Sequence, residues 1–151
     1  MKHHIDALEA QIPQRDRSAA SISNWTVGMQ LHHALGATER IALVTAESEP
    51  GAETQKFNLA RSVVLLSGRI PRGRGKAPKE SLPPEAPTEE ELRRLVEGAR
   101  AAWTKLEAAD PACWWKHFMF GVLRRDQVQR FIGIHNRHHL LIIEDILRAS
   151  N

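Results

Sequence analysis

The strongest constraint on the fold of this chain is a helical stripe near its C-terminal end. Between residues 126 and 149, apolar residues recur at three- and four-residue spacing, which is the pattern of an amphipathic helix. His135 and His139 lie within this stripe, one turn apart on one face, with Cβ atoms roughly 5–6 Å apart. Two imidazoles on an apolar face each need a polar partner once they leave water, and one cation can satisfy both. The stripe consists of Val128, Phe131, Ile132, His135, His139, Ile142 and Ile146.

Three further segments also have helical patterns. Residues 26–47 begin at Thr26, a residue type that caps helices, and residues 88–110 begin with the capping-box pattern Thr-Glu-Glu-Glu. Residues 54–66 begin with polar side chains, end with four apolar ones and are followed by Gly68 as a stop. Those four apolar residues also suit a buried strand, but no second strand-like run is present to pair with them. A helix is therefore expected there.

These patterns predict an all-α fold in a single domain covering residues 1–151, a length typical of one domain. Residues 1–24 form an N-terminal segment with a short helix that ends at Pro13. Residues 69–87 are rich in proline, glycine and basic residues and are expected to be a long loop. Residues 113–123 are expected to be an aromatic-rich loop that leads into the last helix.

Composition narrows the classes of partner. The formal net charge is +3 and the pI about 9.4, with the positive charge concentrated in residues 69–79. That segment has no aromatic residue on which bases could stack, so nucleic-acid binding is not expected. No apolar run approaches the roughly 20 residues that cross a bilayer, so no membrane span is expected. The single Cys113 forms no internal disulfide and no secretory leader pattern is present, which predicts a soluble, cytoplasmic protein.

Eight histidines, with no tyrosine at all, indicate metal or proton chemistry. His33 lies on a mostly apolar face of its helix that also carries Gln30 and Arg40. From this helix alone, a core histidine satisfied by one hydrogen bond is favoured over a metal ligand, and both interpretations stay open. The adjacent His32 points about 100° away from His33. A third ligand for the His135 and His139 pair is thus a hypothesis at this point.

Several motifs taken together resemble the DinB-like (YfiT-like) metalloprotein superfamily. The tryptophan and histidine of its entry helix, Trp-Ser-x-x-x-x-Leu-x-His, have counterparts here at the start of the helix expected at residues 26–47. Two further stretches are similar to the His-Pro-x-Phe-Gly-x-Leu and His-x-x-His-His patterns of one uncharacterised branch, and part of the basic loop fits that branch as well. The resemblance covers most of the chain from Trp25 onward. The matching residues are Trp25-Thr26-Val27-Gly28, Leu31-His32-His33, Ile70-Pro71-Arg72-Gly73, Ala77-Pro78-Lys79, His117-Phe118-Met119-Phe120-Gly121-Val122-Leu123 and His135-Asn136-Arg137-His138-His139.

The resemblance implies an antiparallel four-helix bundle with the long basic loop between its second and third core segments. It also implies that His33, His135 and His139 bind a divalent metal ion inside the bundle. Zinc, nickel and iron all suit imidazole ligands, so the residue types do not choose among them. Known relatives include S-transferases and isomerases that use low-molecular-weight bacterial thiols. By the same resemblance, such a thiol would serve here as co-substrate. The expected partner is therefore a small-molecule substrate.

Two positions depart from the family pattern. Thiol-transferase members often carry glutamine three residues after the last histidine, where this chain has Ile142. The usual Ser or Thr cap of the last helix is replaced by Arg124. The first departure weakens the transfer of a specific activity to this chain, and the second concerns local stability.

Three neutral imidazoles leave an open position on a divalent ion, as in catalytic sites. The first hypothesis is a metal-dependent enzyme that acts by thiol-dependent transfer or by hydrolysis with metal-activated water. Asn136 stands where a His-Glu-x-x-His metalloprotease has its glutamate, so peptide hydrolysis by that route is disfavoured. Candidate substrate contacts are Arg40, His117 and His138. Arg40 also suits a salt bridge, and His117 equally suits structural anchoring of its loop.

The alternative is a non-catalytic metal-binding or dimerising helical bundle. The absence of a recognisable acid or base favours it. A second apolar flank on the last helix indicates burial against more than one neighbour or a subunit contact, and a homodimer is expected. The flank consists of Leu140, Ile143 and Leu147.

Overall fold

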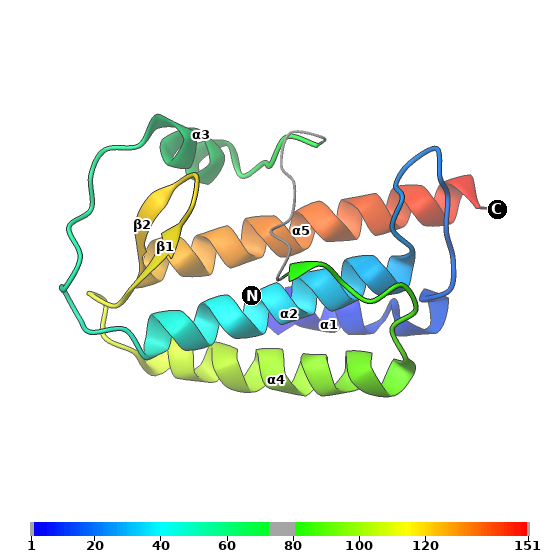
Figure 1. The fold of residues 1–151 in the computed structure, drawn as a ribbon, viewed down its shortest axis with the longest axis horizontal. Helices are drawn as coiled ribbons and strands as arrows, with labels where there is room; N and C mark the ends of the chain where they lie inside the picture. The colour runs from blue at the N-terminus through cyan, green and yellow to red at the C-terminus, as the bar shows by residue number, and fades with distance from the viewer. Residues whose placement is uncertain (1, 73–80, 151) are drawn as a thin grey trace.

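The computed structural model describes residues 2–72 and 81–150, and within these ranges the chain is mostly helical (Figure 1). A two-stranded antiparallel sheet stands at one end of the long helices. The helices are α1 (Lys2–Glu9), α2 (Val27–Ala46), α3 (Leu59–Ser67), α4 (Glu89–Ala108) and α5 (Arg125–Ala149), with the 3-10 turn η1 (Ile12–Gln14), and the strands are β1 (Trp114–His117) and β2 (Gly121–Arg124).

The three long helices α2, α4 and α5 lie side by side, and α1 packs against all three (Figure 1). Helices α2 and α4 run in the same direction, because Pro87 lies beside Gly28 at the start of α2 and Gly98 lies beside Glu39 further along. Helix α5 runs the opposite way. The expected antiparallel arrangement is therefore wrong for α2 and α4. The long connection between them, which includes α3, returns the chain to the starting end before α4 begins.

Local side-chain chemistry sets the helix boundaries. The Thr26 hydroxyl accepts a hydrogen bond from Met29 N at 3.2 Å, and Thr88 forms the expected capping box with Glu91. Helix α3 begins later than the predicted residue 54, because the Asn58 side chain caps it. It ends as expected at Gly68, where φ is 64°.

The segment expected to be an aromatic loop is instead a β-hairpin. Trp115 pairs with Leu123 and His117 pairs with Gly121. Gly121 has a φ of 66°, which a glycine adopts without the steric cost of a Cβ. The hairpin therefore corrects the all-α prediction. Each strand has only four residues and the hairpin runs directly into α5, so the sequence pattern gave no separate strand signal.

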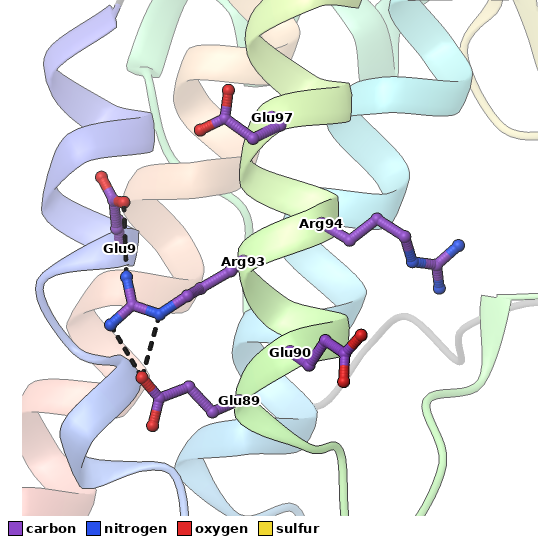
Figure 2. A pocket seen from close by; sticks show the side chains of 6 residues that line it. All are labelled: Glu9, Glu89, Glu90, Arg93, Arg94 and Glu97. Carbon is purple, nitrogen blue, oxygen red and sulfur yellow. Dashed lines mark hydrogen bonds and ion pairs between the residues drawn. The ribbon is translucent and has the colours of Figure 1, made fainter.

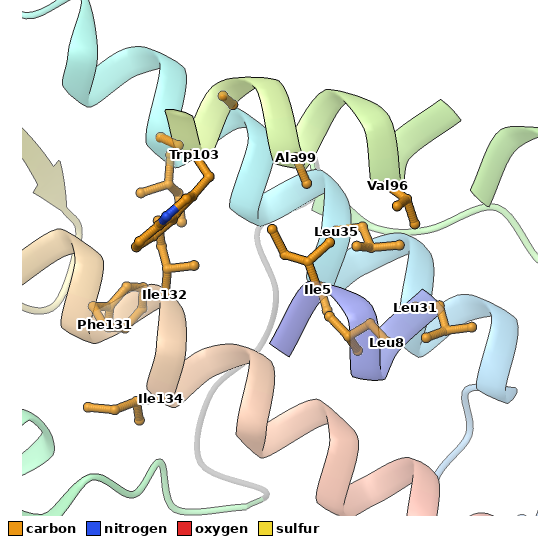
Figure 3. Close-up of a cluster of buried hydrophobic side chains, with 14 of the residues drawn as sticks. Ile5, Leu8, Leu31, Leu35, Val96, Ala99, Trp103, Phe131, Ile132 and Ile134 are labelled. Carbon is orange, nitrogen blue, oxygen red and sulfur yellow. The ribbon is translucent and has the colours of Figure 1, made fainter. Parts of the chain in front are cut away.

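The apolar core lies between α1, α2, α4 and α5 (Figure 3). Ile143 is 1% exposed, and Leu140 and Leu147 pack against the same core. The second flank of α5 is thus covered within the chain, which confirms burial against more than one neighbour and leaves the homodimer a prediction. The cluster in Figure 3 includes Ile5, Leu8, Leu31, Leu35, Val96, Ala99, Trp103, Phe131, Ile132 and Ile134.

The basic loop is described only at its two ends. Arg72 Nη1 forms an ion pair with Asp145 Oδ2 at 2.6 Å, which attaches the first end to α5. Residues 73–80, with the predicted basic positions Arg74, Lys76 and Lys79, lie outside the described residues. Within the described ranges, every helix is too short or too polar to span a bilayer.

Candidate metal centre

Three histidines from two helices meet between α2 and α5. The ligand nitrogens of His33, His135 and His139 all lie within 4.8 Å of one another. Their ring centroids are 4.6 Å apart for His135 and His139, 4.9 Å for His33 and His139, and 5.3 Å for His33 and His135. His139 is buried and the other two are partly buried. His33 therefore faces the pair on α5.

The spacing within the pair matches that of two ligands on one ion. Nε2 of His139 lies 3.3 Å from Nε2 of His135. Zinc–nitrogen bonds of 2.0–2.1 Å in a tetrahedral site separate two ligand nitrogens by roughly 3.3–3.4 Å. Nitrogen donors of this kind suit borderline ions such as zinc. The donor set thus fits a divalent transition metal.

The outer nitrogens of two of these histidines have acceptors. His33 Nδ1 lies 2.9 Å from the carbonyl oxygen of Ser81, and His139 Nδ1 lies 2.6 Å from Gln30 Oε1. Carbonyl and amide oxygens only accept, so both Nδ1 atoms carry hydrogen and both Nε2 atoms keep a lone pair. Histidines that bind metals usually donate their other N–H in this way.

The environment keeps the histidines neutral. Burial, followed by the interaction with His33, lowers the pKa of His135 to about 3. Burial and then the neighbouring His135 hold the pKa of His139 well below 6.5. Burial also lowers the pKa of His33. The Ser81 hydrogen bond raises this pKa, and the charge of Arg40 lowers it further. Protons therefore compete weakly for these nitrogens at neutral pH.

Two polar residues of α5, Asn136 and Glu144, make contacts that serve the fold. Asn136 is completely buried, and its Oδ1 accepts from the Thr38 hydroxyl at 3.1 Å, which joins α5 to α2. Glu144 is exposed and pairs with Arg148 at 3.5 Å. Neither side chain serves the candidate centre as an acid or a base.

The predicted substrate contacts lie at different places. His138 is next to the centre, with its ring edge-on to His139 at 5.3 Å. Burial lowers its pKa, the charge of Arg72 lowers the pKa further, and a hydrogen bond with the Ile70 backbone opposes both. Arg40 is exposed on α2. His117 belongs to the hairpin, apart from the three histidines, and is separated from His135 by Phe131.

A family model described as "Protein of unknown function (DUF1569)" matches residues 18–145, which is most of the sequence. The chain belongs to the DUF1569 family. The match includes α2, α4 and the part of α5 that carries His135 and His139. Comparisons of this DUF1569 chain with curated proteins and with solved structures found no match.

Sequence reasoning missed two features of the DUF1569 centre. Gln30 was recognised only as a polar group on the His33 face, although a buried amide on an apolar face indicates a specific partner. Ser81 contributes its backbone carbonyl, so its residue type gives no signal. Both hold the outer nitrogens of the candidate ligands.

A hollow in the DUF1569 chain lies away from the histidines, beside α4 (Figure 2). It has a volume of about 840 Å³ and is open to solvent. Arg93 pairs across it with Glu89 at 2.7 Å and with Glu9 at 4.0 Å. Exposed pairs of this kind contribute little to stability, and they leave no buried unpaired group that would bind a ligand. The lining residues are Glu9, Glu89, Glu90, Arg93, Arg94 and Glu97.

Proposed function

We propose that this DUF1569 chain binds one divalent metal ion through His33, His135 and His139 and uses it in catalysis. The observation that carries the proposal is the 3.3 Å separation of the Nε2 atoms of His135 and His139, together with the Gln30 contact on His139 Nδ1 that leaves His139 Nε2 free to coordinate. The third histidine completes a set of neutral donors. Three protein ligands leave an open coordination position, as catalytic sites require.

The proposal includes membership of the DinB-like superfamily, with α1, α2, α4 and α5 as its four-helix bundle. Of the two reactions proposed, thiol-dependent transfer is favoured slightly over hydrolysis. The proposed substrate is a small molecule. When bound, the ion supplies Lewis-acid activation of a thiol or of water. The chain itself orients the ligand rings through Gln30 and Ser81, and burial keeps those rings unprotonated.

Elemental analysis of untagged protein tests the metal site. Wild-type protein should contain about one equivalent of zinc, nickel or iron, and His139→Ala should contain none, because both its coordinating nitrogen and its Gln30 contact are lost. His138→Ala is the matched control, since the adjacent ring is oriented edge-on and is not part of the set. Unchanged metal content in His139→Ala would refute the assignment.

A calorimetric screen with small thiols separates the catalytic proposal from its alternative. A metal-dependent enzyme of this kind should bind a low-molecular-weight thiol only when loaded with metal. The alternative is a non-catalytic metal-binding chain, and the buried Asn136 and exposed Glu144 favour it because neither supplies a base. Metal binding with no affinity for thiols or electrophiles would support that alternative.

Assembly as a homodimer also belongs to the proposal and is tested separately. Light scattering should give a mass near twice the 17.0 kDa of one chain. A mass of one chain at micromolar protein concentration would refute the proposed dimer and would not bear on the proposed metal site.

A further inference from the structure

The orientation of the Gln30 amide determines which nitrogen of His139 faces the centre. Gln30 is 2% exposed, and its Oε1 lies 2.6 Å from His139 Nδ1. Because an amide oxygen only accepts, Nδ1 carries the hydrogen and Nε2 keeps its lone pair. That Nε2 is the atom 3.3 Å from His135.

The opposite amide orientation would block the centre. A rotated Gln30 would place its NH₂ group against Nδ1, which would then accept, and the ring hydrogen would move to Nε2. In the structure the Gln30 amide nitrogen has a partner of its own. Gln30 Nε2 donates to Ser23 Oγ at 3.0 Å, and Trp25 N donates to the same oxygen at 3.0 Å. The amide nitrogen therefore points to Ser23 and the amide oxygen to His139.

We propose that Gln30 is a positioning residue that selects the metal-binding tautomer of His139 and thereby sets the metal affinity of the centre. This inference rests on the proposed function, since it requires metal binding at the three histidines. Gln30 acts through His139 and does not touch the ion. Partners of this kind typically contribute roughly 10–100-fold to metal affinity.

Metal affinity measured by competition with a chromophoric chelator provides the first test, with Zn²⁺ as the probe. Gln30→Leu removes the acceptor while keeping much of the side-chain volume, and it should weaken zinc binding by roughly 10–100-fold. Gln30→Glu keeps an acceptor and lacks the competing NH₂ group, so it should bind zinc at least as tightly as wild type. Thr45→Val is the matched control, because Thr45 is also fully buried on α2 and its hydroxyl donates to Ile41 O within the same helix.

Nitrogen-15 NMR of the metal-free protein tests the tautomer directly, without any metal or activity. His139 of wild type and of Gln30→Glu should carry its hydrogen on Nδ1, whereas Gln30→Leu should lose this preference. If Gln30→Leu does not fold, wild type and Gln30→Glu still decide the question.

Three results would overturn the inference. They are hydrogen on Nε2 of His139 in metal-free wild type, wild-type zinc affinity in a folded Gln30→Leu variant, and a large loss of affinity in Gln30→Glu. Failure of wild type to bind any metal, with Nδ1 protonated, would instead refute the proposed function together with the positioning role and leave only the tautomer assignment.

Discussion

At the scale of single residues, His117 shows how a histidine can serve the fold. Its ring stacks on Phe118 and Phe120, with centroids 4.4 Å and 4.3 Å away. Its Nδ1 accepts hydrogen bonds from the backbone N–H groups of Met119 and Phe120, at 3.0 Å and 3.3 Å. Burial lowers its pKa to about 4. These contacts favour structural anchoring of the hairpin over a substrate contact.

The lowered pKa of His117 predicts a pH dependence of stability. Between its native pKa of about 4 and the ordinary 6.5, the unfolded chain binds a proton on His117 that the native chain does not. Stability should therefore fall as the pH drops from about 6.5 towards 4. His117→Asn has no titrating ring and keeps an acceptor, so urea unfolding across this range should show a smaller loss. An identical pH profile in the two proteins would contradict the assigned pKa.

The sequence predicted the histidine pair but not its supports. His135 and His139 were recognisable because i, i+4 spacing places side chains on one helical face regardless of tertiary context. His33 was favoured as a ligand only through the family resemblance, since its own helix favoured a core histidine. The supports from Gln30 and Ser81 depend on how distant segments pack, which helical periodicity does not specify.

At the scale of elements, a buried arginine connects α3 to the hairpin. Arg61 is 6% exposed, and its Nη1 donates to the carbonyl oxygens of Phe120 at 3.1 Å and Val122 at 2.9 Å. Its Nη2 donates to Lys56 O at 2.7 Å. One side chain thus fixes β2 and the chain before α3 through three backbone carbonyls.

Replacing Arg61 should destabilise this end of the chain. Arg61→Met keeps the aliphatic stem but removes the guanidinium from three carbonyls, of which Val122 O keeps Gln55 Nε2 as a donor at 2.8 Å, and we expect a loss of about 2–4 kcal/mol. Arg61→Lys should lose less because the ammonium still donates. Chemical denaturation provides the measurement, and a Met variant as stable as wild type would show that water replaces the guanidinium without cost.

The hairpin was not predicted because its pattern is weak. Its strands have four residues each, and the aromatic residues of Trp114 to His117 equally suit a loop that covers the end of a core. The turn glycine, Gly121, follows Phe120 without the Asn-Gly or Asp-Gly pair that marks tight hairpins. The long helices were predicted better, because their apolar periodicity extends over several turns.

At the scale of the whole molecule, the candidate ligands join α2 to α5, which pack against each other through much of the core. The topology could not be predicted in full, because apolar stripes identify buried faces without giving helix direction. The shared direction of α2 and α4 is visible only from contacts in the folded chain, such as that of Pro87 with Gly28. The connection between α2 and α4 is long enough to permit either direction.

Metal binding should stabilise the entire fold. An ion present at 100 times its dissociation constant contributes about 2.7 kcal/mol if it binds only the native state. For a chain of this size, that corresponds to a rise in Tm of roughly 5–11 °C. Calorimetry with zinc and with excess chelator provides the measurement. A triple variant with alanine at all three histidines should show no zinc-dependent change, and an equal shift in that variant would place the stabilising ion elsewhere.

The separation of His33 from His135 along the chain also bears on biosynthesis. The polypeptide emerges N-terminus first, so α2 is available long before α5 has been made. Until α5 docks, His33 alone offers a single imidazole, which discriminates poorly among metals. At the proposed metal site, selection among ions therefore follows the docking of α5 on α2, when all three donors are present together.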